Sequence, residues 1–202
     1  MTCNVGILVF NDVEVLDFAG PYEVFTTASR VYKREQQPGT PDAFAVFTVG
    51  KNGDPVRARA GLSVFPDFGF DNHPHIDLLL IPGGVVTAEL DDPEVIRWIA
   101  KTAERARLTA SICTGAFLLA KTGLLDGKSA TTHWEDIADL RAMFPGVTVL
   151  EGRRWVDEGT IVSSAGISAG IDMSLHLVER LVDRQLAERT ARQMEFDWTE
   201  NN

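Results

Sequence analysis

Four short runs of mostly apolar residues are the sequence feature that most restricts how this chain can fold. They cover residues 5–10, 43–49, 77–81 and 108–112. A strand that is apolar on both sides must be covered on both faces, as the central strands of a parallel sheet are. Helical patterns and turn residues alternate with the runs. We therefore expect an α/β fold with an open, doubly wound, mostly parallel sheet flanked by helices.

The spacing of apolar residues and the residue types at the helix ends predict where the helices lie. The first should lead from Leu16 to about residue 30, with Pro21 in its first turn, where a proline is tolerated. Another is expected over 92–107, because acids stand at its start and bases near its end. A third should open at 133 and run to about 144. The last long helix is expected to continue through the tail to about 198.

Two hairpins are also expected. Residues 154–163 should turn around Asp157-Glu158-Gly159, and residues 56–58 and 62–65 should form a small hairpin at the edge of the sheet.

Composition limits the class of protein and its partners. The 202 residues fit one domain, 1–202, with 45% hydrophobic residues to fill its core. The net charge of −10 and the lack of a Lys/Arg block argue against direct nucleic-acid binding. No apolar run reaches the ~18 residues that a membrane span needs, and the first residues carry no basic leader. The two cysteines, Cys3 and Cys113, make no disulfide framework, so we expect a cytoplasmic protein.

Cys113 is the most plausible centre of chemistry. It ends the run 108–112 and precedes a helical stretch of small and apolar residues. Strand, sharp turn and helix form a nucleophile elbow, which raises one side chain at the carboxyl edge of a sheet. The positive end of the following helix is expected to stabilise a thiolate and so to lower the thiol pKa. The alternative is a buried structural cysteine, the more common fate of a free thiol.

Other polar groups are expected at the same edge of the sheet. Asp17 comes soon after the first strand, where it could hold or deliver a proton or simply cap the helix. Glu14 in the same loop is the alternative acid. Gly83 and Gly84 follow the run 77–81, so their N–H groups can turn towards a ligand and, with the amide of Thr114, form an oxyanion hole.

The histidines offer weaker signals. His133 follows a short strand at 129–132 and could be a base, a substrate contact or a residue that orients its loop; the orienting role is the simplest. His73 and His75 flank Pro74 without an acid-rich third ligand, so we expect surface residues and no metal site. His176 is most simply a packing residue.

The residue types around Cys113 favour one kind of chemistry. The residue after the thiol is Thr114, whereas a Cys-His hydrolase would need a histidine beside it. A carboxylic acid near a thiolate has a raised pKa and is a better acid than base. The pattern therefore favours proton donation to a carbon or nitrogen that sulfur has attacked, and it argues against peptide cleavage.

Five motifs in order resemble the DJ-1/PfpI (ThiJ) superfamily, and within it most closely the isonitrile (isocyanide) hydratases. The resemblance covers nearly the whole chain. The motifs are Leu16-Asp17-Phe18-Ala19-Gly20-Pro21, Ile81-Pro82-Gly83-Gly84, Ser111-Ile112-Cys113-Thr114-Gly115, Ala130-Thr131-Thr132-His133-Trp134 and Gly166-Ile167-Ser168-Ala169-Gly170-Ile171-Asp172.

This resemblance implies a flavodoxin-like fold of the class I glutamine amidotransferase type and a homodimer without a cofactor. It implies that Cys113 attacks the terminal isonitrile carbon, Asp17 protonates that carbon, and water releases an N-substituted formamide. Thr114 would contribute its amide and its hydroxyl. Two alternatives stay open: a metabolite or redox sensor like the sensor domains of AraC-type regulators, and an enzyme for reactive carbonyls such as glyoxals.

Overall fold

A six-stranded sheet forms the centre of the protein in the computed structural model, which describes residues 2–201. The strand order is β2-β1-β5-β6-β10-β9. All neighbours are parallel except the edge pair of β10 and β9. The bounds are β1 (Cys3–Leu8), β2 (Phe44–Val49), β5 (Leu78–Ile81), β6 (Leu108–Ile112), β9 (Trp155–Asp157) and β10 (Ile161–Ser164). The expected mostly parallel sheet is confirmed. Each of the four apolar runs overlaps one of its strands, although β1 begins two residues before the run 5–10.

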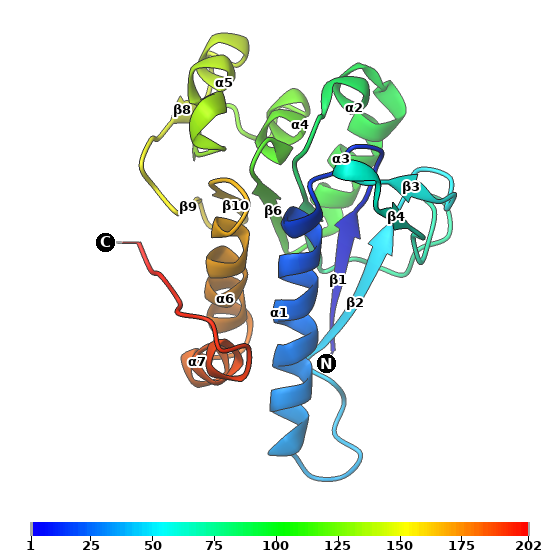
Figure 1. Ribbon diagram of the computed structural model, residues 1–202, viewed down its shortest axis with the longest axis vertical. Helices are drawn as coiled ribbons and strands as arrows, with labels where there is room; N and C mark the ends of the chain where they lie inside the picture. The colour runs from blue at the N-terminus through cyan, green and yellow to red at the C-terminus, as the bar shows by residue number, and fades with distance from the viewer. Residues whose placement is uncertain (1, 202) are drawn as a thin grey trace.

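Within residues 2–201, seven α-helices connect and cover the strands (Figure 1). Helices α1, α6 and α7 contact one another, and α2, α3 and α4 form a second group. Their bounds are α1 (Val15–Arg34), α2 (Thr87–Asp91), α3 (Pro93–Arg105), α4 (Gly115–Lys121), α5 (Ile137–Met143), α6 (Ala169–Leu181) and α7 (Arg184–Gln193). None of the helices in residues 2–201 is both long and apolar enough to cross a membrane.

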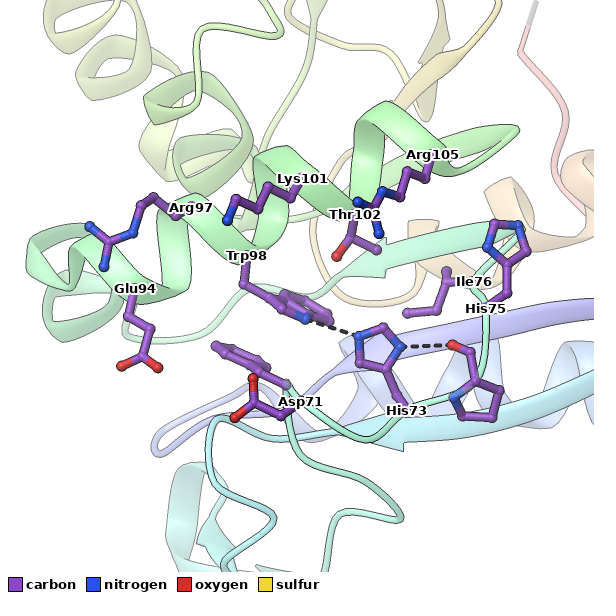
Figure 2. A pocket seen from close by; sticks show the side chains of 12 residues that line it. Asp71, His73, His75, Ile76, Glu94, Arg97, Trp98, Lys101, Thr102 and Arg105 are labelled. Carbon is purple, nitrogen blue, oxygen red and sulfur yellow. Dashed lines mark hydrogen bonds between the residues drawn. The ribbon is translucent and has the colours of Figure 1, made fainter.

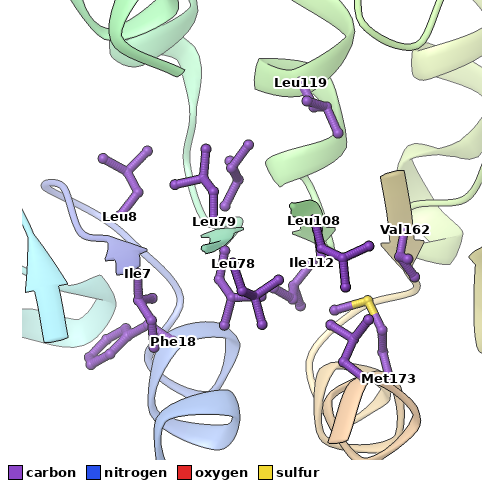
Figure 3. Close-up of a cluster of buried hydrophobic side chains, with 14 of the residues drawn as sticks. Ile7, Leu8, Phe18, Leu78, Leu79, Leu108, Ile112, Leu119, Val162 and Met173 are labelled. Carbon is purple, nitrogen blue, oxygen red and sulfur yellow. The ribbon is translucent and has the colours of Figure 1, made fainter. Parts of the chain in front are cut away.

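The buried core lies on both faces of the sheet (Figure 3). Phe18 of α1 and Met173 of α6 pack on one side of the strands, whereas Leu119 of α4 lies on the other. Neighbouring strand residues such as Ile7 and Leu8 point to opposite faces, and both are buried. Double coverage explains why these strands are apolar at nearly every position.

The small strands differ from expectation in where they pair. The hairpin of β9 and β10 is confirmed, and it adds the antiparallel edge of the main sheet. The other predicted hairpin also forms, from β3 (Val56–Arg57) and β4 (Ser63–Val64), but as a separate two-stranded sheet. A further separate pair joins β7 (Ser129–Ala130) to β8 (Thr148–Val149). Strands of two residues make too few ladder bonds for the sequence to specify their partners.

Two helix predictions are wrong in detail. Helix α1 begins at Val15, so Pro21 lies in its interior and not in its first turn. A proline there cannot donate to the carbonyl of Asp17, four residues earlier, which leaves the helix one bond short beside the candidate site. The tail is not one continuous helix: α6 ends at Leu181, and α7 starts afresh after Asp183, whose side chain accepts from the amide of Leu186 at 2.7 Å.

Candidate active site

Cys113 occupies a sharp turn between β6 and α4, as the elbow predicts. Its φ of +55° is in the left-handed region, which costs a residue with a side chain about 1–2 kcal/mol. The backbone is fixed there on both sides: its N–H donates to Ser164 O at 3.2 Å, and its carbonyl accepts from the hydroxyl of Thr132 at 2.8 Å. Strain that the surroundings hold in place is typical of a functional site.

Gly115 makes the close approach of this turn to the sheet possible. A Cβ atom at this position would overlap the carbonyl oxygen of Ile81 at the end of β5. Only glycine lets the first turn of α4 start so close to the neighbouring strand. The thiol of Cys113 is therefore placed beside the loop that follows β5.

The thiol pKa is raised, so the expectation of a lowered pKa is wrong. Cys113 is 7% exposed, and burial, together with the charge of Asp17, raises the pKa of its thiol to about 12. The backbone N–H and the hydroxyl of Thr114 act in the opposite direction but are outweighed. The loss of water around the sulfur and the charge of a neighbouring carboxylate both raise the thiol pKa. The seven-residue helix α4 and the two donors of Thr114 lower it by less. The thiol is thus protonated at neutral pH.

Asp17 is the buried acid beside this thiol. Its side chain is 0% exposed, and burial raises the pKa of its carboxyl group to about 7. The amide of Gly83, which donates to Oδ2 at 3.1 Å, and the neighbouring Cys113 thiol work against the increase. Within residues 2–201, Oδ1 has no hydrogen-bond partner. Thiol and carboxyl thus form a coupled pair that loses its first proton near neutral pH.

The glycine loop is bound differently from the expected oxyanion hole. The hydroxyl of Thr114 donates to Gly84 O and accepts from Gly84 N, both at 2.8 Å, and the Gly83 amide is held by Asp17. Both glycine amides expected to face a ligand are therefore already occupied, which corrects that prediction. Of the three expected donors, the Thr114 amide is the one that faces the sulfur.

Glu14, the alternative acid, has another role. Its carboxylate forms an ion pair with Arg59 at 3.3 Å in the lining of the pocket, whereas Asp17 is the acid that raises the pKa of the thiol. Of the two candidate acids, Asp17 therefore lies beside the thiol.

His133 orients its loop, the simplest of its predicted roles. Its Nδ1 accepts from the amide of Glu135 at 3.3 Å and so caps the 3-10 turn Trp134–Asp136. Its ring packs against Gly166, where a Cβ atom would collide with it. The ring also lines the pocket above Cys113, which keeps a substrate contact possible.

Ile167 is a site residue that the sequence analysis did not single out. It has a φ of +54° and is 38% exposed in the wall of the pocket. Its backbone also lowers the pKa of Asp17, which places it next to the carboxylate. The motif that contains it was visible, but a β-branched residue gives no sequence signal for a left-handed backbone.

The pocket above the thiol is small. Its volume is ≈200 Å³, and its walls come from the loops after β1, β3, β5, β6, β7 and β10. Asp17 and Gly83 are not among its lining residues. Within residues 2–201, no group of three His, Cys, Asp or Glu residues could hold a metal ion.

A larger cavity of ≈580 Å³ lies elsewhere, between α3 and the loop 70–76 (Figure 2). It contains both His73 and His75. Figure 2 shows the His73 ring between two partners: its Nε2 accepts from Trp98 Nε1 at 3.1 Å, and its Nδ1 lies 2.7 Å from Pro74 O. Both ring nitrogens of His73 are therefore used within the protein.

Replacing Gly83 by alanine should disrupt the site. The added Cβ would lie 2.5 Å from the Thr114 hydroxyl, 2.6 Å from the Thr114 amide nitrogen and 3.0 Å from Asp17 Oδ2. Overpacking of this kind costs about 1–3 kcal/mol. We expect a loss of that size in the free energy of unfolding, measured in urea, and a changed rate of Cys113 alkylation. Gly146→Ala is the matched control, since its Cβ meets only the Asp126 side chain at 3.3 Å. Equal stabilities of the two variants would contradict the tight packing described here.

Comparison with known proteins supports these observations. A model of the DJ-1/PfpI family matches residues 4–180. An isonitrile hydratase from Pseudomonas putida is 34% identical over 197 residues, which is 97% of this chain and 79% of that protein. The crystal structure of a THiJ/PfpI family protein from Pseudomonas syringae superimposes with a TM-score of 0.84 at 30% identity, covering 98% of this chain and 76% of that one.

Similarity extends to regulatory proteins as well. The HTH-type transcriptional regulator GbdR from Pseudomonas aeruginosa is 30% identical over 184 residues, covering 91% of this chain but 48% of the regulator. This chain therefore spans about half the length of that relative.

Proposed function

The chain belongs to the DJ-1/PfpI family, and from this premise we propose that it is a cysteine-dependent hydratase that converts small isonitriles into N-substituted formamides. The observation that carries the proposal is that the Cys113 thiol, on its strained turn, and the fully buried carboxyl group of Asp17 lie close enough for each to shift the pKa of the other. Similarity to the Pseudomonas putida isonitrile hydratase over 97% of the chain supports the same choice.

The first step uses both members of this pair. The sulfur lone pair attacks the terminal carbon of R–N≡C and forms the S–C bond, while the S–H bond breaks and its proton passes to Asp17. Asp17 then gives that proton to the same carbon, which yields the thioformimidate S–CH=N–R. Because the thiol pKa is high, a free thiolate does not accumulate, and attack must be coupled to this transfer. The Thr114 amide stabilises the charge that develops on sulfur.

The second step releases the product. Water adds to the carbon and loses a proton to Asp17, which passes that proton to the nitrogen of the C=N bond. The C–S bond then breaks with its electron pair going to sulfur, and the new hydroxyl gives its proton through Asp17 to that sulfur, which leaves the formamide carbonyl and restores the thiol. The sum is R–NC plus water giving HC(=O)–NH–R. Asp17 acts as a shuttle and ends as it began.

Incubation with cyclohexyl isonitrile tests the proposal. We expect the formamide, followed by mass spectrometry, to accumulate in many-fold excess over protein, since ordinary enzymes turn over about 1–1000 times per second. Heat-unfolded protein serves as the blank, and glyoxal is tested in parallel. Consumption of glyoxal without formamide production would favour the carbonyl-enzyme alternative. A folded, reduced protein that turns over neither would favour a sensor, the role that the similarity to a transcriptional regulator suggests.

A further inference from the structure

The pocket above Cys113 is unevenly charged. Four side chains with formal charge line it: Glu14, Arg59, Glu135 and Asp136. Arg59 is the one cation among the described residues of this lining. Asp17 is buried outside this lining, and its charge also raises the pKa of the thiol.

The single cation is already engaged. Arg59 forms its ion pair with Glu14 at 3.3 Å, so these two charges largely cancel each other. Glu135 and Asp136 both belong to the 3-10 turn Trp134–Asp136 that His133 caps, and neither forms an ion pair with Arg59 in the described structure. Arg59 therefore does not compensate the second pair of carboxylates.

His133 offsets these two carboxylates only in part. Its Nδ1 lies 3.5 Å from Asp136 Oδ2 and 3.7 Å from Glu135 Oε2, but the same nitrogen accepts the Glu135 amide hydrogen at 3.3 Å. His133 also counteracts the increase that burial causes in the pKa of Asp136. A single imidazole nevertheless stands against two carboxylates, so it cannot balance both charges.

The acidic groups around the pocket act electrostatically on the sulfur of Cys113. The charges of Asp17 and Asp136 both raise the pKa of the Cys113 thiol, and Glu14 raises the pKa of Asp17. In a pocket of ≈200 Å³ a substrate cannot stay far from these groups. An anion brought to the sulfur would meet like charges on more than one side.

We propose that the carboxylates around the Cys113 pocket make it selective against anionic substrates, so that it accepts small isonitriles whose substituent is uncharged or cationic. Glu135 and Asp136 are the specificity-determining residues. This inference rests on the proposed hydratase function for its substrate class, but the selection by charge acts on any electrophile that reaches the thiol.

The first test uses thiol reagents in place of substrates. In Cys3→Ala protein, Cys113 is the one remaining thiol. Its rate constant is measured with 2-aminoethyl methanethiosulfonate, a cation, and with 2-sulfonatoethyl methanethiosulfonate, an anion. The ratio of the cation rate to the anion rate is then compared with the same ratio for a small neutral thiol. We expect the protein to favour the cation by a further factor of about ten or more at low salt. Added salt should reduce this factor, because it screens exposed charges.

Paired variants assign the effect to the pocket. Glu135→Gln combined with Asp136→Asn should return the ratio most of the way to that of the small thiol. Asp71→Asn combined with Glu104→Gln removes two exposed acids outside the pocket and changes the net charge equally. This control pair should leave the ratio as in the parent. A ratio that both pairs lower equally, or that already matches the small thiol in the parent, would overturn the inference.

Turnover gives the second test. Isocyanoacetate and its methyl ester differ mainly in one negative charge, and we expect kcat/KM for the ester to be at least about ten-fold higher. Equal values would overturn the inference while leaving the hydratase function standing. If neither compound yields a formamide, the hydratase proposal fails, and the reagent ratios alone decide whether the pocket selects by charge.

Discussion

Replacing Cys113 by alanine is expected to reduce formamide production by roughly 10⁴-fold or more, to the level of the uncatalysed reaction. The Thr114 hydroxyl beside the thiol is not free to replace it, since it both donates to and accepts from Gly84. Production of the formamide by each variant is measured by mass spectrometry at equal concentrations of folded protein.

The protein should stay folded after this change. Alanine keeps the Cβ atom and therefore the backbone strain at φ +55°, and it loses only the contacts of one buried sulfur. Cys113→Gly removes the thiol and also relieves about 1–2 kcal/mol of that strain, so its free energy of unfolding should exceed that of Cys113→Ala. Cys3→Ala is the matched control. Cys3 begins β1 at the opposite edge of the sheet, and turnover should be unaffected. Turnover that survives in Cys113→Ala would exclude the thiol as the nucleophile.

Asp17→Asn should cost about 10²–10⁴-fold in turnover, because the thiol proton then has no acceptor and the substrate carbon no donor. The pH profile carries the same information. In the wild type, kcat/KM should rise as pH increases through about 7, where the pair loses its first proton and Asp17 becomes able to accept another. This rise should be absent in Asp17→Asn. A profile that is identical in the two proteins would assign the titration to another group.

The same substitution should stabilise the fold at alkaline pH. The pKa of Asp17 rises from 3.8 in the unfolded chain to about 7 in the folded protein, so the folded state holds the proton more tightly. Burying the ionised carboxylate therefore lowers the free energy of unfolding. This loss is absent below pH 3.8, grows as pH rises between the two pKa values, and is complete above about pH 7, where it amounts to at most about 4 kcal/mol. Asparagine keeps an oxygen acceptor for the Gly83 amide without the charge.

Urea unfolding at pH 4.5 and pH 8 measures this effect. The gain in free energy of unfolding for Asp17→Asn over the wild type should be larger at pH 8. Asp71→Asn, at an exposed position, should give no such difference between the two pH values. A gain that does not depend on pH would mean that the carboxyl group is not held in its protonated form by the fold.

The sequence is informative about the fold wherever burial is complete. Strands β1, β5 and β6 coincide with apolar runs because both faces of each strand are covered, and their parallel order follows from the helices between them. The meeting of Asp17 and Cys113 could be expected for the same reason, since parallel strands end at one edge. Two-residue strands such as β3 and β7 have no comparable pattern.

The electrostatics of the site could not be predicted from the sequence. A thiol after a strand and before a helix suggests a stabilised anion, but the actual pKa depends on how much water reaches the sulfur and on where one carboxylate lies. The Gly83 and Gly84 amides looked free because the sequence does not show that Asp17 and Thr114 occupy them. Such outcomes are decided by tertiary hydrogen bonds between segments that are 30 or more residues apart.

The candidate site also depends on late parts of the chain. The Cys113 amide is held by the carbonyl of Ser164, and Ile167 closes one wall of the pocket, whereas Asp17 comes from the first helix. A nascent chain or a proteolytic fragment that ends before β10 would carry the thiol and its acid but would lack the strand that fixes their geometry. Recovery of catalysis during refolding should therefore lag behind helix formation and report assembly of the whole sheet.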